Sequence, residues 1–420
     1  MKKTTPKLAI DGGPKTFTTP PPPRGLLTNA EKKAVMALFD EAIAAGRAIG
    51  YAGPQEDGYC REFARSMGGG YADAVNSGTT ALYVALRALE PPPFSEVIVP
   101  PITDPGGVMP VALCNCIPIV ADSAPGTYNV GADQIAARIT PRTSAIIVAH
   151  IVGEPADLAP ILALARAKRI PVIEDVAQAH LAVYRGKPCG AHGTLGTFST
   201  MFGKHHCTGG QGGVVFTKSR DLYIKVRHYA DRGKPYGLTG WQPGNVVASL
   251  NFNLDEIGAC IGRVQLRRLP SMVRRRRALV AAIRRGTARL KAVHPVEPVR
   301  GAEPSWWFLR VRLDLSRLAV GKDRFCEALK AEGPIAVTPS YRHIPLEAPW
   351  FKERRVFGNS GLPWTAPQYK GDPDRKYETP NAIAAVESCI NLDIHESMRP
   401  ADGVRIARAL AKVEAAYLKR

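Results

Sequence analysis

The sequence predicts an α/β protein, with a large domain built on a mostly parallel sheet flanked by helices and a smaller C-terminal α+β domain. Short Val- and Ile-rich segments alternate with helix-patterned segments between residues 79 and 217, as strands do when right-handed helical crossovers join them. A long amphipathic helix pattern then interrupts this alternation, and strands and helices are mixed after it. With 420 residues the chain is long enough for two domains.

The elements of the first domain follow one another regularly. Residues 1–25 are rich in Pro, Thr and Gly, which predicts an extended N-terminal arm, and a helix pattern covers residues 29–45. Further helices are expected at 79–89, 132–138 and 158–168, and strands at 96–100, 117–122, 145–150, 171–175, 194–200 and 212–217.

The second part of the chain begins with a long helix expected from residues 251–269 onward. This pattern continues through the run Arg274–Arg277. A strand at 306–313, helices at 322–332 and 401–418, and an irregular Pro-rich segment at 347–379 complete the chain. We predict a large domain over residues 26–270 and a small domain over 271–420.

Composition favours a cytoplasmic globular protein. The hydrophobic fraction of 45% and the charged fraction of 22% are ordinary for such a chain. The eight cysteines show neither disulfide-framework nor zinc-site spacing, so we expect reduced thiols and no metal. No signal peptide is expected, and the longest uncharged stretch, between Asp104 and Asp122, is broken by prolines and makes a poor membrane span.

The charge balance favours anionic ligands. The net charge is 56 − 37 = +19, which attracts partners from nucleotide diphosphates to nucleic acid. The run Arg274–Arg277 has no interleaved aromatic residues, so we interpret it as a solvated helix face or a groove wall and expect no nucleic acid. A non-catalytic or DNA-associated regulatory protein stays as an alternative because of the charge.

Lys204 is the most informative candidate for chemistry. It lies between Ser199 and a glycine-rich turn that leads into the apolar segment Val214–Phe216. Burial beside a sheet lowers the pKa of a lysine and frees its lone pair, which makes a Schiff-base nucleophile. Ser199 and the glycine backbone could hold an anion such as a cofactor phosphate. The alternative is a solvated surface charge.

Two further segments lie where ligands gather in a parallel sheet, at the carboxyl ends of strands. Asp175 ends a buried strand and could pair with a protonated ring nitrogen, as pyridoxal phosphate requires, or serve as a helix N-cap. Gly78 and Thr79 open a helix after a turn, where free N–H groups bind phosphate, although an ordinary N-cap explains the pattern nearly as well.

Together the motifs resemble those of the DegT/DnrJ-type sugar aminotransferases over residues 8 to 415. The matching segments, in order, are Asn76–Leu82, Ile98–Thr103, Thr127–Asn129, Ile173–Ala179, Phe198–Ser199 with Lys204, and Asn251–Ala259 with Gln265–Leu266. Several ordered motifs make the resemblance far more specific than any one of them.

The resemblance implies a fold-type I enzyme that uses pyridoxal 5′-phosphate and forms an obligate homodimer with shared sites. Lys204 would bind the cofactor aldehyde and move the proton, and Asp175 would pair with the ring nitrogen. The remaining cofactor contacts would be Gln178 at the phenolic oxygen, Ser199, Gly78 and Thr79 at the phosphate, and Asn251 at the phosphate of the partner subunit's cofactor.

The reaction implied is transfer of an amino group from L-glutamate or L-glutamine to a keto-sugar, nucleotide-linked or free, or to a keto-cyclitol. Some relatives carry histidine in place of the lysine and dehydrate a deoxysugar instead. Lys204 keeps the aminotransferase position and His205 is its neighbour, so transamination is favoured and dehydration is the alternative.

This chain departs from the family pattern at three places. Asp104, which we assign to the cofactor site, replaces a common ring-stacking aromatic residue, and Asn253 replaces a common arginine. The turn after Lys204 is one residue longer than usual.

Four residues are candidate substrate contacts: His150, His205, Tyr341 and His343. His150 follows a strand and fits a core histidine equally well. Trp306–Phe308 is expected to pack in the small domain, with one face near the substrate.

Overall fold

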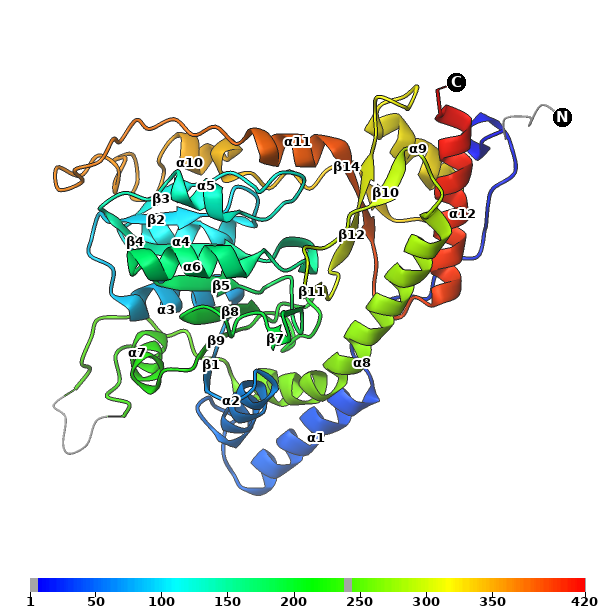
Figure 1. The fold of residues 1–420 in the computed structure, drawn as a ribbon. Helices are drawn as coiled ribbons and strands as arrows, with labels where there is room; N and C mark the ends of the chain where they lie inside the picture. Colours follow the sequence, from blue (N-terminus) through cyan, green and yellow to red (C-terminus); the bar gives the residue numbers. More distant parts are fainter. Residues whose placement is uncertain (1–6, 238–243, 420) are drawn as a thin grey trace.

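The computed structural model describes residues 7–237 and 244–419, and its centre is a seven-stranded sheet (Figure 1). The strand order is β1-β9-β8-β5-β4-β2-β3, and β9 runs antiparallel to both of its neighbours while the other pairs are parallel. The strands are β1 (Tyr71–Val75), β2 (Glu96–Val99), β3 (Ile117–Val120), β4 (Thr143–Ala149), β5 (Val172–Asp175), β8 (Leu195–Ser199) and β9 (Gly213–Thr217). The predicted, mostly parallel sheet is confirmed.

Both faces of this sheet are buried because successive side chains point to opposite sides of a strand. In β4, Ile146 belongs to one hydrophobic cluster and Ile147 to the other. One cluster includes residues of α3 (Gly78–Leu89), α4 (Met109–Leu113) and α7 (Arg220–Ala230). The other includes residues of α2 (Pro54–Ser66), α5 (Ala132–Ala136), α6 (Leu158–Lys168) and the start of α8 (Glu256–Thr287).

The C-terminal part has its own four-stranded antiparallel sheet, in the order β10-β12-β14-β13. Its strands are β10 (Val293–Pro295), β12 (Phe308–Leu313), β13 (Val337–Thr338) and β14 (Cys389–Asp393). Helices α9 (Lys322–Ala331) and α12 (Pro400–Tyr417) and the second half of α8 enclose a third hydrophobic cluster with it. The predicted smaller α+β unit therefore has a core of its own.

Helix α8 joins the two parts as one continuous helix across the predicted boundary at residue 270. Pro270 lies inside it, and α8 changes direction along its length in Figure 1. Proline removes one helical hydrogen bond and bends the helix. The boundary itself stays a prediction.

The described part of the N-terminal arm packs on the small unit. Leu8 belongs to the small unit's cluster, the short helix η1 (Ala9–Asp11) follows, and Thr16 donates its N–H to the Glu332 carboxylate at 3.1 Å. Helix α1 (Asn29–Ala44) then lies along α8 (Figure 1). Residues 1–6 of the predicted arm lie outside the described residues.

The remaining elements are short. They are η2 (Pro105–Gly107), η3 (Ile151–Gly153), η4 (Pro345–Glu347), α10 (Pro349–Lys352), α11 (Pro380–Ser388) and a three-stranded sheet of β6 (Val183–Tyr184), β7 (Lys187–Pro188) and β11 (Ala302–Glu303). The predicted irregular segment 347–379 contains only α10, yet it buries Trp364 and Tyr369, and the Tyr369 hydroxyl donates to Glu96 Oε1 at 3.0 Å.

Every helix and strand that the sequence pattern predicted is present, with ends that differ by a few residues. The long helix begins at Glu256 and not at residue 251, because Asp255 caps it. The sequence pattern did not predict helices α2, α4, α7, α10 and α11 or strands β1, β6, β7, β10, β11, β13 and β14. Among the residues that the structure describes, none of the helices combines the length and the apolar character that a membrane span requires.

Candidate active site

A cavity of about 220 Å³ opens at the carboxyl ends of β5 and β8. Six of the predicted cofactor and catalytic residues line it: Gly78, Thr79, Asp104, Asp175, Ser199 and Lys204. They come from the start of α3, from η2 and from the ends of two neighbouring parallel strands. The fold therefore brings together residues that lie up to 126 positions apart, from 78 to 204.

The start of α3 forms one wall. Ser77 caps the helix by accepting from the Thr80 N–H at 3.1 Å, and its own N–H donates to Thr80 Oγ1 at 3.0 Å. The first N–H groups of a helix have no acceptor within the helix, so those of Gly78 and Thr79 can bind an anion. A Cβ atom at Gly78 would lie only 2.5 Å from Ser199 Cβ, so the close approach of α3 to β8 requires glycine.

Lys204 lies on the turn after β8 and is only 7% exposed. Its N–H donates to the Met201 carbonyl at 2.9 Å, and its Nζ lies 4.1 Å from the centre of the Trp307 ring. Burial lowers the pKa of Lys204, and the carboxylates of Asp175 and Asp104 partly oppose this. The amine is therefore easier to deprotonate than an ordinary lysine.

Asp175 ends β5 and accepts the Ala177 N–H at 3.0 Å. Burial raises its pKa, opposed by that hydrogen bond and by Lys204. A cationic ring nitrogen beside this carboxylate would offset the cost of burying its charge. Asp104 caps η2 by accepting the Gly106 N–H at 3.0 Å, which explains an aspartate at this position.

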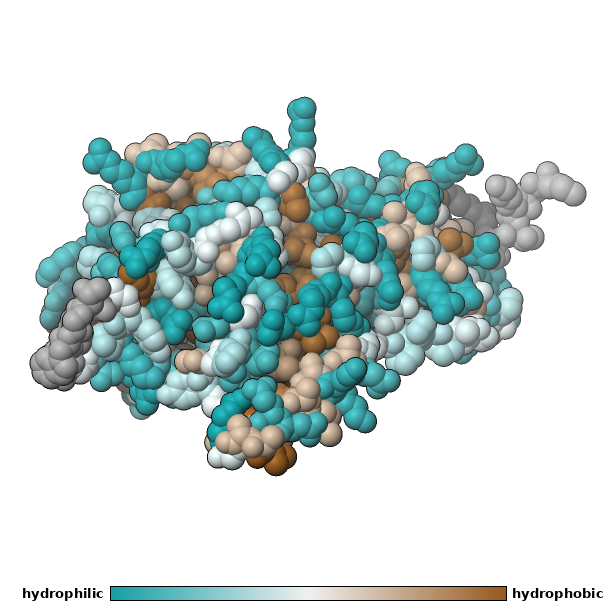
Figure 2. All heavy atoms as spheres, turned by 90° about the horizontal axis from the view of Figure 1, so that it is seen from below, coloured by the Kyte–Doolittle hydropathy of each residue, from teal (hydrophilic) through white to brown (hydrophobic). Residues whose placement is uncertain are grey.

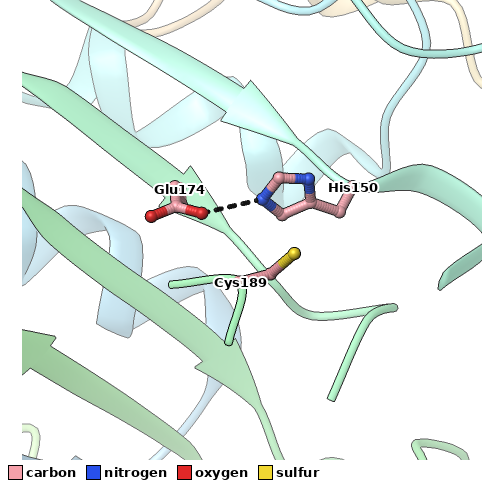
Figure 3. Close-up of side chains that lie close together, drawn as sticks. All are labelled: His150, Glu174 and Cys189. Carbon is pink, nitrogen blue, oxygen red and sulfur yellow. Dashed lines mark hydrogen bonds and ion pairs between the residues drawn. The ribbon is translucent and has the colours of Figure 1, made fainter. Parts of the chain in front are cut away.

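Glu174, the residue before Asp175, points to the opposite face of β5 and anchors the strand. Its carboxylate accepts the N–H groups of Gly190, His192 and Gly193 at 2.6–2.8 Å and contacts His150 Nε2 at 3.1 Å (Figure 3). Burial would raise the pKa of Glu174, but His150 and these N–H groups hold it below its usual value.

His150, Glu174 and Cys189 lie close enough together to suggest a metal site, since their ligand atoms are within 4.8 Å of one another. Their hydrogen bonds argue against it. His150 Nδ1 accepts the Ala156 N–H at 3.0 Å, and the Glu174 oxygens are already engaged. Burial also raises the pKa of Cys189 well above its usual value, away from the thiolate that a metal needs.

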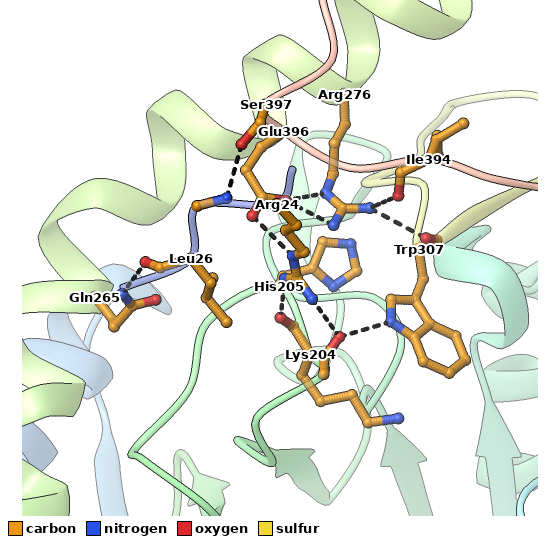
Figure 4. Close-up of polar contacts among 12 residues, drawn as sticks. Arg24, Leu26, Lys204, His205, Gln265, Arg276, Trp307, Ile394, Glu396 and Ser397 are labelled. Carbon is orange, nitrogen blue, oxygen red and sulfur yellow. Dashed lines mark hydrogen bonds and ion pairs between the residues drawn. The ribbon is translucent and has the colours of Figure 1, made fainter. Parts of the chain in front are cut away.

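A buried ion-pair network fixes the backbone of the Lys204 turn from the other side (Figure 4). Arg24 donates to the carbonyls of Gly203 and Lys204 and to Glu396 Oε1 at 2.9 Å. Arg276 of α8, 1% exposed, donates to Glu396 Oε2 at 2.7 and 3.0 Å. Burial would raise the pKa of Glu396, but the two guanidinium groups hold it below its usual value. The Lys204 side chain points away from this network.

The other predicted residues do not line this cavity. Gln178 is buried, accepts the Val152 N–H at 2.8 Å and donates to the Tyr341 hydroxyl at 2.7 Å. His343 is exposed, with its ring centre 4.5 Å from that of Tyr341. Asn251 is exposed and bridges to Asp231, and it does not line the cavity.

Two predicted substrate contacts take a different place. His150 is completely buried with both ring nitrogens engaged, which leaves no face for a substrate. His205 is also completely buried, and its Nε2 contacts the Ser305 carbonyl at 3.2 Å. Both histidines are buried in the interior, and neither lines the cavity.

The sequence pattern missed several residues of the site. Arg24 follows a proline-rich arm and shows no chemical pattern of its own. Trp307 was expected to pack with one face near the substrate, but its contact with Lys204 was not expected. Met201 and Gln211 also line the cavity, and only their position beside Lys204 could have indicated them.

The family model for the DegT/DnrJ/EryC1/StrS aminotransferases matches residues 29–411. The chain belongs to this family. The prediction from the motifs is confirmed, including an enzyme of the pyridoxal phosphate-dependent aminotransferase class.

Curated members of the family include two similar proteins. GDP-perosamine synthase of Caulobacter vibrioides is 34% identical over 75% of this chain and 86% of its own length. L-Glutamine:scyllo-inosose aminotransferase of Streptomyces griseus is 32% identical over 97% of both chains.

A solved aminotransferase from Psychrobacter cryohalolentis superposes with a TM-score of 0.81 at 27% identity, covering 93% of this chain and 98% of that one. The predicted fold-type I architecture is thereby confirmed.

The cavity fits pyridoxal phosphate. It combines a buried lysine of lowered pKa, a carboxylate at a strand end and a glycine-opened helix start beside Ser199. These groups match the aldehyde, the ring nitrogen and the phosphate in turn.

Proposed function

We propose that this aminotransferase moves an amino group from L-glutamine or L-glutamate to the keto group of a polyhydroxylated ring, either a keto-cyclitol or a keto-sugar. The observation that carries the proposal is the buried Lys204 amine, which lies in one cavity with Asp175 and the α3 start in a chain of this family. The similarity to the scyllo-inosose aminotransferase over 97% of both chains supports the acceptor class.

Each residue has a proposed task. Lys204 binds the cofactor aldehyde and carries a proton to and from the reacting carbon, and Asp175 pairs with the ring nitrogen. Gly78, Thr79 and Ser199 hold the phosphate, and Gln178 lies near the ring with Tyr341. Pyridoxal phosphate, when bound, supplies the electron sink that lets an amino group leave one carbon for another.

The lysine favours transamination over the alternative dehydration. A buried amine with a lowered pKa at the cavity wall is suited to return a proton. His205, the neighbouring histidine, is turned away and contacts Ser305. Dehydration is therefore the alternative that the screen of amino donors distinguishes from transamination.

We also propose a homodimer with shared sites. Helix α1 presents Met36, Phe39 and Ile43, which are 42–75% exposed and lie on one face at helical spacing. Figure 2, which views the molecule from the side of α1, shows hydrophobic atoms interrupting the hydrophilic surface. Phe202 and Leu250 are also exposed and lie near Lys204 and Asn251 in the chain, and we propose that a second copy brings Asn251 to a cofactor phosphate.

Two further predictions remain proposals. The eight cysteines are unpaired, which supports a reducing, cytoplasmic location. The separate hydrophobic cluster of the C-terminal sheet supports a small domain after residue 270.

The test is a screen of amino donors and acceptors with the holoenzyme. L-Glutamine or L-glutamate should remove the visible absorption of the bound cofactor, and a keto-cyclitol or keto-sugar should restore it with release of an aminated product. Failure of every amino donor to change the absorption would refute transamination and favour dehydration.

A further inference from the structure

A second cavity, of about 470 Å³, adjoins the Lys204 site. Trp307 lines it, and the same ring lies 4.1 Å from Lys204 Nζ. Tyr341, which accepts a hydrogen bond from Gln178, lines it as well. The cavity is therefore placed to hold the part of a substrate that extends from the reacting carbon.

Three residues of its lining each carry a buried polar atom without a hydrogen-bond partner in the part of the chain that the structure describes: Ser340 Oγ, Asn391 Nδ2 and His395 Nδ1. Folded proteins pair most of their buried polar atoms, because an unmade hydrogen bond costs stability. Three such atoms around one cavity indicate a ligand that completes them.

Asn391 indicates most clearly which ligand groups the cavity can bind. It lies on β14, is 2% exposed, and its Oδ1 accepts the Tyr128 hydroxyl at 3.4 Å. The amide nitrogen is thus left as a free donor. The Ser340 hydroxyl can donate or accept, so the two residues together match the hydroxyl groups of a polyol.

The charges of the lining argue against a phosphate. Arg24 and Arg276 line the cavity, but both are bound to Glu396 and to backbone carbonyls. Burial lowers the pKa of His395, which favours its neutral ring. Asp393 adds a carboxylate at the rim. A diphosphate here would have to displace existing ion pairs and face this carboxylate.

We infer that this cavity binds the hydroxylated ring of an uncharged acceptor, with Asn391 and Ser340 determining specificity by hydrogen bonds to its hydroxyl groups. The inference rests on the proposed function and narrows it: the acceptor is a keto-cyclitol or a free keto-sugar, not a nucleotide-linked one. A site built to bond a hydroxyl rejects ligands that leave its groups unpaired.

The experiment compares wild-type holoenzyme with Asn391→Leu and Ser340→Ala. Loading by L-glutamine and discharge by scyllo-inosose are measured separately in single turnovers. We expect each substitution to weaken the acceptor step roughly tenfold, as loss of one or two hydrogen bonds does, while the loading step changes less than about twofold. The control is Ser388→Ala, whose hydroxyl bonds the Ala384 carbonyl at 2.8 Å outside this cavity, and it should change neither step.

Ser340→Ala also separates binding from folding. It removes a hydroxyl that has no partner in the described part of the chain, so the melting temperature should not fall. Unchanged acceptor kinetics in both cavity variants would mean that only water fills the cavity and would overturn the inference. A larger kcat/KM for a GDP-linked keto-hexose than for scyllo-inosose or a free keto-hexose would also overturn the inference. Comparing scyllo-inosose with the free keto-hexose shows whether the acceptor is a cyclitol or a free sugar.

A binding measurement distinguishes failure of the proposed function from failure of the cavity inference. If the wild-type enzyme aminates none of these acceptors, the proposed function fails, but binding of the unreactive polyol scyllo-inositol still tests the cavity. Calorimetry should show binding to wild type that weakens in Asn391→Leu, and equal binding to both would contradict the inference.

Discussion

At the scale of single residues, the chemistry depends on how Lys204 is kept free of competing contacts. Its backbone is fixed by Arg24 and Met201, while its amine lies over Trp307 near two carboxylates. Hydrogen bonds hold the backbone of the turn, while the amine stays available at the cavity. A side chain that carries a proton needs this kind of support.

Lys204→Ala should reduce transamination by about 10²–10⁴-fold, because no other lysine lines the cavity among the described residues. The measurement is the rate of amino transfer at saturating donor. Lys218→Ala is the matched control, since Lys218 bonds the Gly68 carbonyl at an exposed position and should keep full activity. Comparable loss in both variants would contradict the assignment.

The sequence indicated Lys204, Asp175 and the α3 start because each follows a local pattern: a glycine turn, a strand end, a helix cap. Arg24 and Glu396 could not be indicated, since their pairing joins positions 372 residues apart. His150 was placed at the substrate because a strand end suggests it. The structure shows that its ring turns instead to Glu174.

At the scale of elements, Glu396 connects the N-terminal arm, α8 and the Lys204 turn. Removing one partner of a buried ion pair leaves the others uncompensated. Glu396→Gln should therefore lower the free energy of unfolding by about 3–5 kcal/mol in urea denaturation. Glu303→Gln, which breaks the exposed pair with Arg277, should cost less than about 1 kcal/mol. An equal loss of unfolding free energy in the two variants would contradict a stabilising role of the buried network.

The packing of α2 predicts a pH dependence. Burial raises the pKa of Glu56 to about 8, and the nearby Asp73 carboxylate adds to this. Between the ordinary value of 4.5 and about 8, the folded state holds a proton that the unfolded state has released. Stability from this group is therefore complete below pH 4.5 and is lost as the pH rises to about 8.

Glu56→Gln should remove this loss, so its free energy of unfolding should exceed that of wild type most clearly near pH 8. Denaturant unfolding at several pH values measures it. Asp57→Asn, an exposed change on the same helix, is the control and should leave the pH profile as it is. A Glu56→Gln profile parallel to that of wild type would contradict the assignment.

Among the elements, those with strong periodicity were predicted and those defined by distant partners were not. Strand β1 is short, and its central Asp73 is unlike a buried strand residue. Arg227 of α7 pairs with this carboxylate at 3.2 Å, which explains its burial. Only the folded chain shows that pairing.

At the scale of the whole molecule, the proposed dimer rests on the exposed apolar face of α1. Ile43→Glu should weaken the proposed dimer and reduce activity together, because a charge on an apolar interface is costly to bury. Analytical ultracentrifugation measures the first effect and amino transfer the second. Leu113→Glu, at a residue 48% exposed on α4, should change neither. A monomeric Ile43→Glu variant with full activity would refute shared sites.

Six of the predicted cofactor and catalytic residues lie at one edge of the sheet. This could be predicted because parallel strands end on the same side. The acceptor cavity could not be predicted from the sequence, because residues of β13, β14, the N-terminal arm and α8 line it together only in the folded chain. The residues proposed for the chemistry therefore lie in local sequence motifs, whereas those proposed for specificity come from distant parts of the chain.

The role of Lys204 is tested most directly by reducing the holoenzyme with borohydride and mapping the labelled peptide. We expect one pyridoxyl group per chain, on Lys204. A label on any other lysine, or no label in an enzyme that still transfers amino groups, would contradict it.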